Sequence, residues 1–179
     1  MQITLIRHLP TEWNKKTWLQ GKRDIELASI TGDLRNGIAE NRKRLRSLSP
    51  FDIVLASTLK RTHQTAQLYG YQYEIEALLD ELDFGEFEGL PKKRLVEKHG
   101  KTWLENPTEL VLGESLKHFE ERISLFLDKY KNYLNILVFG HGAWIRAMIS
   151  YLEYGDINSM NKITVGNNAC FTLAFNPER

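Results

Sequence analysis

Imidazole and guanidinium side chains stand at the ends of three apolar runs in this sequence. The residues that end the runs are Arg7 and His8 after residues 3–6, Ser57 with Arg61 after residues 52–56, and Gly140, His141 and Gly142 after residues 135–139. Guanidinium groups bind a phosphate dianion through forked hydrogen bonds. A neutral imidazole can attack phosphorus, and its ordinary pKa of about 6.5 leaves much of it unprotonated near pH 7. The set therefore predicts phosphoryl transfer by way of a covalent histidine intermediate, which divides one difficult hydrolysis into two steps.

A carboxylic acid is expected beside these groups, because a departing alkoxide needs a proton. Residues 79–85, with the sequence LDELDFG, offer carboxylates close together in one short loop. From residue types alone, Glu81 and Asp83 both remain candidates for the proton donor.

The elements that must position these residues can be read from the hydrophobic pattern. The three apolar runs are nearly continuous, which is typical of strands covered on both faces of a parallel sheet. Helices are expected at residues 31–48, 60–69, 115–133 and 143–152, and a last strand at residues 170–175. Alternation of strands and helices predicts an α/β fold, a three-layer αβα sandwich with a mostly parallel central sheet. Ligands bind at the carboxyl ends of strands in such sheets, so the histidines and arginines are expected to converge there.

Length and composition favour one soluble domain. The chain has 179 residues, of which 42% are hydrophobic and 26% charged, enough for a single buried core and too few for two ordinary domains. We expect one domain over residues 1–179, in which the irregular segment 84–114, with short helices, is a candidate lid that selects the substrate. The net charge is only +1, so the chain lacks the strongly basic surface that binding to nucleic acid or to an anionic membrane usually needs. No leader or spanning segment is recognised, so a cytoplasmic location is expected.

Other phosphatase chemistries lack their residues in this sequence. Cys170 is the only cysteine, and the position six residues later, where the cysteine class needs arginine, holds Asn176. No Asp-x-Asp triplet follows an apolar run, and there is no phosphate-binding loop of the G-x-x-x-x-G-K-[ST] type.

Five blocks of the sequence together resemble the histidine phosphatase superfamily, also called the phosphoglycerate mutase-like or "RHG" family. They are LIRH with TEWN and QG at residues 5–21, STLKRT with QTA at 57–66, LDELDFGEFEG at 79–89, GES at 113–115 with Arg122, and GHG with IRA at 140–147. The resemblance covers nearly the whole chain and is nearest to the phosphatase branch, which includes alpha-ribazole phosphatase and broad-specificity enzymes. The resemblance implies the fold of that superfamily and a small phosphorylated substrate, and it implies that neither a cofactor nor a metal is needed.

The resemblance also implies roles for single residues. His8 corresponds to the nucleophile, Glu81 to the proton donor and His141 to the second catalytic histidine. The phosphate-binding positions are Arg7, Asn14, Arg61 and Gly142. One departure lies beside the nucleophile, where Leu9 and Pro10 replace the usual glycine and acidic or amide residue. Leucine adds bulk there and proline removes a backbone donor, so the local loop geometry is expected to differ.

A phosphomonoester phosphatase is the function that the sequence favours. The first alternative is a phosphoglycerate mutase, which shares the pocket and returns the phosphoryl group to its substrate. Such mutases are similar but longer between the acid loop and the second histidine, whereas about 60 residues separate Glu81 from His141 here. The second alternative is an idle module that binds a phosphorylated ligand, and it would be expected to have lost one of the catalytic residues.

Overall fold

A single mixed sheet organises the chain in the computed structural model, which describes residues 1–176. The strands lie in the order β3-β2-β4-β1-β5, and only β5 runs antiparallel to its neighbour. Their bounds are Gln2–Arg7 for β1, Ile53–Ala56 for β2, Glu74–Ile75 for β3, Asn135–Gly140 for β4 and Cys170–Ala174 for β5. The expected α/β sandwich with a mostly parallel sheet is thus confirmed.

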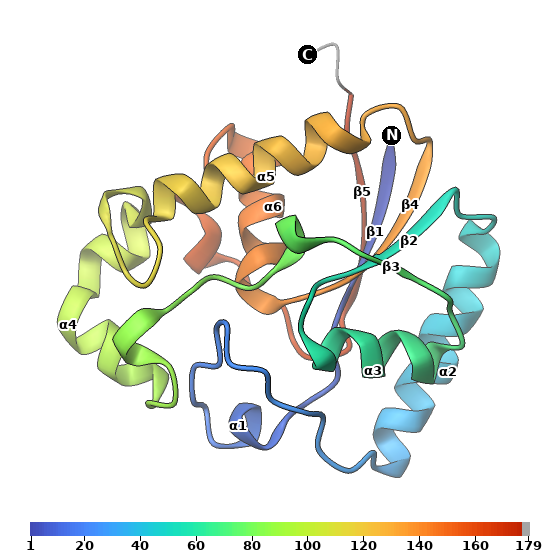
Figure 1. Cartoon of the computed structure of the whole chain (residues 1–179), viewed down its shortest axis with the longest axis horizontal. Coiled ribbons are helices and arrows are strands. Elements are labelled where there is room, and N and C mark those ends of the chain that lie inside the picture. The colour runs from blue at the N-terminus through green and yellow to red at the C-terminus, as the bar shows by residue number, and fades with distance from the viewer. Residues whose placement is uncertain (177–179) are drawn as a thin grey trace.

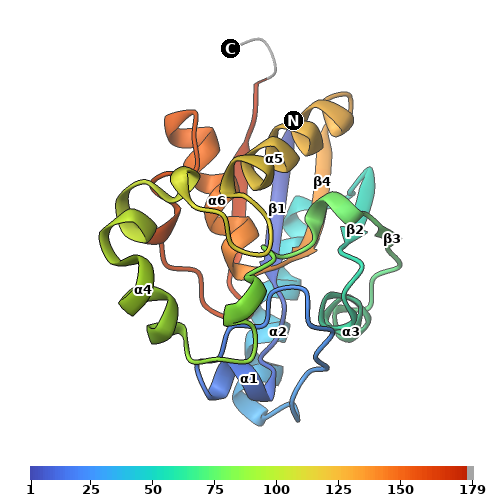
Figure 2. The same ribbon diagram turned by 60° about the vertical axis from the view of Figure 1, so that its left-hand side comes forward.

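Helices cover both faces of the sheet (Figure 1). They are α1 (Glu12–Lys15), α2 (Gly32–Leu48), α3 (Lys60–Tyr69), α4 (Lys92–Glu105), α5 (Leu116–Tyr130) and α6 (Gly142–Tyr154). The helices α2 and α3 lie on one face, and α5 and α6 lie on the other. Figure 2 shows that α4 and α1 lie beyond the sheet, toward the end where β1 and β4 finish.

The two layers exist because the central strands are apolar on both faces. In β1, Ile3 and Leu5 join the larger core under α5 and α6, whereas Ile6 points into the smaller core under α2 and α3. The strand β4 repeats this alternation: Ile136 and Val138 face the larger core, and Leu137 and Phe139 face the smaller one. Side chains alternate across a strand, so an unbroken apolar run supplies both cores at once.

The helix bounds differ from the sequence-based ones in a few places. The helix expected at residues 115–133 ends at Tyr130, because residues 131–134 form turns that lead into β4. The helix α6 continues to Tyr154, where Gly155 ends it in the left-handed conformation with φ +85°. The short helices expected in segment 84–114 are present: 3-10 turns at Gly85–Phe87 and Pro107–Glu109 flank α4, which is itself kinked at Gly100, whose φ is +36°. Within residues 1–176, no helix is long and apolar enough to span a membrane.

Candidate active site

Three strand ends bring the predicted phosphate-handling residues to one edge of the sheet. Arg7 pairs with Gly140 across β1 and β4, and Ala56 pairs with Phe139 across β2 and β4. The residues that follow each strand therefore start from the same level of the sheet. The rings of His8 and His141 lie edge to face, with centroids 5.4 Å apart. The convergence that parallel strands were expected to produce is present in the structure.

A cavity of about 280 Å³ lies above these strand ends. Six of the seven catalytic and phosphate-binding candidates line it: Arg7, His8, Asn14, Arg61, Glu81 and Gly142. The seventh, His141, is fully buried and lies behind the wall of the cavity, against His8. Phe84, Lys92 and Trp103 of the segment 84–114 complete one side. The cavity is large enough for a phosphate and a small alcohol.

The ring of His8 is held so that one nitrogen remains available. Its Nδ1 lies 2.6 Å from the carbonyl oxygen of Leu9, and a carbonyl can only accept, so Nδ1 carries the proton. Nε2 is then the unprotonated nitrogen of the neutral ring. Burial lowers the pKa of His8 well below 6.5, and the charges of Arg61 and Arg7 lower it further. His8 is therefore a neutral imidazole at pH 7, with a lone pair on Nε2.

His141 is held by a hydroxyl group instead of a carbonyl. Its Nε2 lies 2.7 Å from Oγ of Ser57, which also accepts a hydrogen bond from the backbone N–H of Leu59. Burial lowers the pKa of His141 well below 6.5, and Arg61, His8, Arg7 and Lys22 add to the effect. The Nδ1 atom is buried and finds no hydrogen-bond partner among residues 1–176. His141 is therefore a neutral ring with one nitrogen that has no partner in the described part of the chain.

Backbone carbonyls orient the two arginines. Arg7 donates from Nη1 to the Val165 carbonyl at 2.5 Å, and Arg61 donates from Nη1 and Nη2 to the carbonyls of Arg23 and Gly21 at 2.7 and 2.8 Å. The Nε atoms of both arginines are buried without a partner in the described part of the chain. Burial lowers the pKa of each guanidinium to about 10, so both remain cationic at pH 7. Two oriented cations with unused donors suit an anionic ligand.

Glu81 lies at the first turn of α6. Its Oε2 accepts a hydrogen bond from the backbone N–H of Ala143, and its Oε1 accepts from Trp144 and Leu82, all at 3.0 Å. The first N–H groups of a helix have no partner inside the helix, so a side-chain acceptor is favoured there. These contacts fix the carboxyl group at the cavity wall.

The two carboxylates that the sequence left open have different surroundings. Glu81 lines the cavity, whereas Asp83 does not, and Oδ1 of Asp83 accepts from the backbone N–H of Gly85 at 2.9 Å. Gly113 packs so closely on this group that a Cβ atom there would lie 1.9 Å from the same oxygen. Asp83 therefore shapes the loop, and Glu81 is the carboxylate that reaches the cavity.

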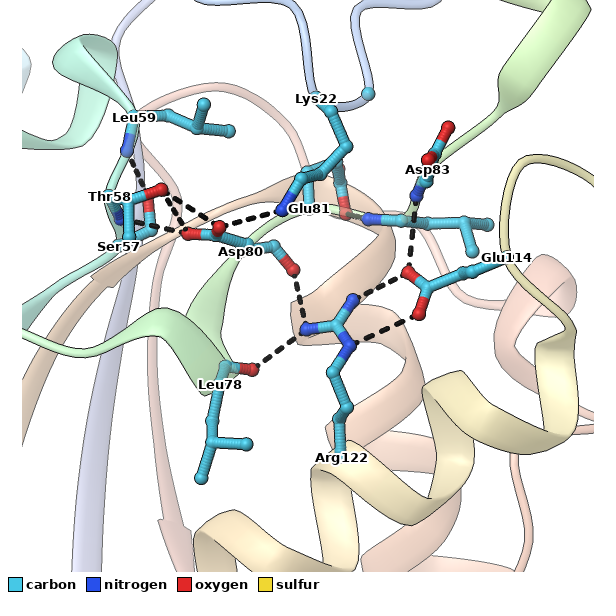
Figure 3. Close-up of polar contacts among 12 residues, drawn as sticks. Lys22, Ser57, Thr58, Leu59, Leu78, Asp80, Glu81, Asp83, Glu114 and Arg122 are labelled. Atoms are coloured by element: carbon cyan, nitrogen blue, oxygen red, sulfur yellow. Dashed lines mark hydrogen bonds and ion pairs between the residues drawn. The ribbon is translucent and has the colours of Figure 1, made fainter.

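An ion pair outside the cavity supports the acid loop (Figure 3). Arg122 binds the Glu114 carboxylate at two points, with Nη2–Oε1 at 2.7 Å and Nε–Oε2 at 3.2 Å. Its Nη1 donates to the carbonyls of Leu78 and Asp80 at 3.0 and 2.9 Å. Arg122 belongs to one of the five sequence blocks, and no role could be assigned to it from the sequence. Its contacts now show that it positions the residues on the N-terminal side of Glu81.

Asp80 is a functional-site neighbour that sequence reasoning missed. It is buried, accepts from the backbone N–H and the hydroxyl of Thr58, and forms an ion pair with Lys22 at 2.8 Å (Figure 3). It thereby joins the acid loop to the end of β2 and to the loop after α1. Its position next to Glu81 was visible in the sequence, but its partners are 22 and 58 residues away.

Asn14 and Gly142 contact the site in different ways. Asn14 forms a reciprocal cap with Thr11 at the start of α1, and its Oδ1 accepts from Thr11 and from Nδ2 of Asn167 at 3.3 Å. Because the oxygen is occupied, the amide nitrogen is the group left to donate into the cavity. A Cβ atom on Gly142 would lie 3.0 Å from Cζ of Arg7, so the missing side chain gives the guanidinium its place.

Two further residues line the cavity without a role predicted from the sequence. Asn167 donates from Nδ2 to the carbonyl of His8 at 3.1 Å, which ties the loop before β5 to the end of β1. Arg146 comes from the second turn of α6, and its Nε is buried without a partner in residues 1–176. The sequence block IRA contained this arginine, and the helical spacing from His141 could have placed it at the same edge.

The Leu9–Pro10 departure does not obstruct the cavity. Leu9 is fully buried in the smaller core, and its backbone N–H donates to Oγ1 of Thr65 at 3.1 Å. Its carbonyl is the group that holds Nδ1 of His8. The carbonyl of Pro10 accepts from the N–H of Ala28 at 2.9 Å. The leucine side chain therefore packs in the core, and backbone contacts hold the loop at His8.

The combined geometry suits attack on phosphorus. An unprotonated Nε2, two oriented guanidinium groups and a carboxyl group share one small cavity, so a nucleophile, charge neutralisation and a proton carrier are all present. Within the described residues, no group of three or more His, Cys, Asp or Glu side chains is arranged to hold a metal ion.

Comparison with known proteins points the same way. The family described as "Histidine phosphatase superfamily (branch 1)" matches residues 3–179. A phosphoserine phosphatase from Entamoeba histolytica, solved in complex with 3-phosphoglyceric acid, is 29% identical with a TM-score of 0.78, over 97% of this chain and 90% of that one. The alpha-ribazole phosphatase from Shigella flexneri has a TM-score of 0.77 at 24% identity, over 99% and 92%. A 2,3-bisphosphoglycerate-dependent phosphoglycerate mutase from Cytophaga hutchinsonii is 31% identical over 84% of this chain and 76% of the mutase.

Proposed function

This chain belongs to the histidine phosphatase superfamily, branch 1, and is a phosphatase of small phosphorylated metabolites; we propose that it acts through a phosphohistidine formed on His8. The observation that carries the proposal is the contact between Nδ1 of His8 and the carbonyl of Leu9 at 2.6 Å. It fixes the tautomer that leaves a lone pair on Nε2. A buried neutral imidazole between two cations is the nucleophile that a phosphate dianion requires.

In the first step, Nε2 of His8 attacks phosphorus and the bond to the ester oxygen breaks. Glu81 gives its proton to that oxygen, and the alcohol leaves. The phosphoryl group is then bonded to Nε2, and the ring keeps its Nδ1–H hydrogen bond to the Leu9 carbonyl, which stabilises the positive charge that develops on the ring. Arg7 and Arg61 neutralise the charge on the equatorial oxygens.

In the second step, a water molecule attacks phosphorus and the bond between phosphorus and Nε2 breaks. Glu81, now ionised, accepts the proton of this water, so inorganic phosphate leaves and the enzyme returns to its first state. We assign to His141 a hydrogen bond from Nδ1 to a phosphate oxygen, since Ser57 can donate its hydroxyl proton to Nε2. Asn14 and the N-terminus of α6 at Gly142 complete the phosphate site.

The segment 84–114 contributes part of the cavity wall. Phe84, Lys92 and Trp103 come from this segment and line the cavity. We propose that the segment selects the alcohol part of the substrate, because its side chains share the cavity with His8.

A mutase is the second candidate, because a phosphoglycerate mutase is among the relatives of this chain. A mutase would return the phosphoryl group from His8 to bound phosphoglycerate, whereas a phosphatase transfers it to water. Incubation with 3-phosphoglycerate and a small amount of 2,3-bisphosphoglycerate, which can phosphorylate His8, separates the two: a phosphatase releases inorganic phosphate and glycerate, and a mutase forms 2-phosphoglycerate with little free phosphate.

The deciding experiment is hydrolysis of p-nitrophenyl phosphate in excess EDTA by the wild type and by His8→Ala. We expect chelator-resistant activity in the wild type and less than a few per cent of it in the variant. His99→Ala is the matched control, because His99 lies on α4 against Phe87 and outside the cavity. Quenching in alkaline detergent, which preserves the acid-labile bond between phosphorus and Nε2, should trap label from a ³²P-labelled substrate on wild-type protein and none on His8→Ala. Substantial turnover by His8→Ala would rule out the mechanism.

A further inference from the structure

A second, larger cavity adjoins the first. It has a volume of about 610 Å³ and lies between α4 and the loop of residues 161–166. Four residues line both cavities: Arg7, Lys92, Trp103 and Arg146. The two spaces are therefore neighbours that share one boundary, and a ligand with its phosphate at His8 can extend into the second. We call this second cavity the side chamber.

The walls of the side chamber combine apolar and cationic side chains. Val96, Trp103 and Leu104 come from α4, and Ile163 and Val165 from the opposite loop. The charged residues are Arg7, Lys92, Lys101 and Arg146, and no aspartate or glutamate of the described chain lines the chamber. Such a space favours an anion, since a cationic group would find no counter-charge in its walls.

Arg146 is the cation with the most unused binding capacity. Its Nε is buried without a partner within residues 1–176, and its Nη2 reaches Oδ1 of Asn161 only at 3.4 Å. Asn161 is itself fixed by donating to the Trp103 carbonyl at 2.6 Å. The guanidinium groups of Arg7 and Arg61, by contrast, are bound by backbone carbonyls at 2.5–2.8 Å. The donors of Arg146 are therefore the least satisfied of the three guanidinium groups at the cavity.

Lys92 adds a second cation at the shared boundary. Partial burial, followed by the charges of Arg146 and Arg7, lowers the pKa of Lys92 below 10.5. The three cations therefore repel one another where the two cavities meet. Glu81 attracts Arg146 only while it is ionised, and in the first step of the proposed mechanism Glu81 carries a proton. With the phosphate on Arg7, Arg146 and Lys92 are then left to be satisfied by another group.

We propose that the substrate carries a second anionic group, a carboxylate or a second phosphate, which binds Arg146 and Lys92, and that its apolar part lies against Trp103 in the side chamber. This inference rests on the proposed phosphatase function, because it takes the first phosphate to lie at His8. It names a substrate class: phosphomonoesters of acidic alcohols or phenols. Neutral sugar phosphates and phosphate esters that carry an ammonium group should have a lower kcat/KM than these acidic substrates.

Three phenyl phosphates with similar leaving groups test the charge preference in the wild type. They are 3-carboxyphenyl, 3-carbamoylphenyl and 3-(aminomethyl)phenyl phosphate, which carry a negative, a neutral and a positive group. We expect kcat/KM to be at least about tenfold higher for the carboxylate than for the amide, the effect of one charge-assisted hydrogen bond, and lowest for the amine. Fructose 1,6-bisphosphate against fructose 6-phosphate measures the same preference with a second phosphate as the anion.

Substitutions test which residues produce the preference for a substrate with a second anionic group. Arg146→Gln should reduce the carboxylate-to-amide ratio of kcat/KM by about tenfold, and Arg146→Lys should retain part of it. Lys93→Gln is the matched control, since Lys93 is exposed on the same helix as Lys92 and lines neither cavity. Equal kcat/KM for all three phenyl phosphates in an active wild type would overturn the inference and leave the phosphatase function standing. A wild type that hydrolyses none of them would contradict the function itself.

Discussion

Arg122 and Glu114 form a two-point ion pair with side chains that are 11% and 15% exposed, and neither residue lines the catalytic cavity. The same guanidinium donates to the carbonyls of Leu78 and Asp80, the residues that lead into Glu81 (Figure 3). Glu114 in turn accepts from the backbone N–H of Asp83 at 3.2 Å. The pair therefore binds the acid loop on both sides of Glu81.

Replacement of Arg122 should lower both stability and rate. In Arg122→Gln, the carboxylate of Glu114 loses its charged partner, and a mostly buried pair broken on one side costs about 3–5 kcal/mol. The acid loop also loses two carbonyl contacts, so kcat should fall. Urea unfolding and steady-state hydrolysis of a phenyl phosphate measure the two effects. The control is Arg94→Gln, because the Arg94–Glu97 pair is exposed and a change of at most about 1 kcal/mol is expected. Equal effects of the two substitutions would contradict a role for Arg122 in support of the loop.

The buried histidines make stability depend on pH in a defined window. Burial and the neighbouring arginines lower the pKa values of His8 and His141, whereas both take their ordinary value of about 6.5 in the unfolded chain. Below pH 6.5 the unfolded chain therefore binds more protons, and the free energy of unfolding decreases as the pH falls. The stabilising contribution is complete above pH 6.5 and is lost toward the lower folded pKa.

Urea unfolding at pH 7.5 and 5.5 measures this dependence. We expect a loss of about 1–1.5 kcal/mol for each of the two histidines over this interval. Glu76 and Glu114 have lowered pKa values, so their titration changes the free energy of unfolding below their ordinary pKa of 4.5, outside the interval from pH 5.5 to 7.5. The double variant His8→Asn with His141→Asn should lose most of the dependence. The same slope in wild type and double variant would show that other groups cause it.

Leu9 should matter for folding more than for chemistry. Its side chain is fully buried in the smaller core, whereas only its backbone carbonyl contacts His8. Leu9→Ala should therefore cost about 2–5 kcal/mol of stability and leave kcat of the folded enzyme close to wild type. Leu134→Ala, at a leucine that is 78% exposed, should change stability by less than about 0.5 kcal/mol. A large loss of kcat in folded Leu9→Ala would mean that the side chain also orients the nucleophile.

Most of the fold could be predicted from the sequence because its signals are local. The apolar runs of β1, β2 and β4 are nearly continuous, and the start of α2 and the end of α3 are marked by Thr31 and Gly70 within the sequence itself. The two-residue strand β3 was missed, because Glu74 and Ile75 are exposed at the sheet edge and carry no hydrophobic pattern. The short helices of segment 84–114 could be expected but not bounded, since Gly100 interrupts α4 with a kink.

Some residues of the candidate site could be predicted from the sequence, and others could not. Residues at strand ends, such as His8 and His141, were predictable because parallel strands fix where they meet. The contacts of Asn167, Asp80 and Arg146 depend on loops that come together only in the folded chain. Residue types alone could not decide between Glu81 and Asp83 as the proton donor. The structure was needed, because the answer depends on which carboxylate meets the first turn of α6.

That choice leads to a test of the proton donor. An alkyl phosphate leaves as a strongly basic alkoxide and needs a proton, whereas p-nitrophenyl phosphate leaves as a stabilised anion. Glu81→Gln should therefore lower kcat/KM for an alkyl phosphate by about 10²–10⁴-fold and for p-nitrophenyl phosphate by much less. The ratio kcat/KM is the right quantity, because it reports the steps up to phosphohistidine formation and excludes the later attack of water.

Glu81 is also proposed to accept the proton of water in the second step, so Glu81→Gln should show a second kinetic effect. The side-chain amide of Glu81→Gln is not basic enough to take the proton of the attacking water. Phosphohistidine formed from p-nitrophenyl phosphate should therefore accumulate in this variant, visible as a burst of nitrophenolate followed by slow turnover. Asp83→Asn is the matched control, since an amide oxygen can still accept from the N–H of Gly85 and neither signature is expected. Equal loss on both substrates without a burst would assign the proton to another group. The burst together with the substrate difference would assign both proton transfers to Glu81, because only a group that serves each step produces the two effects at once.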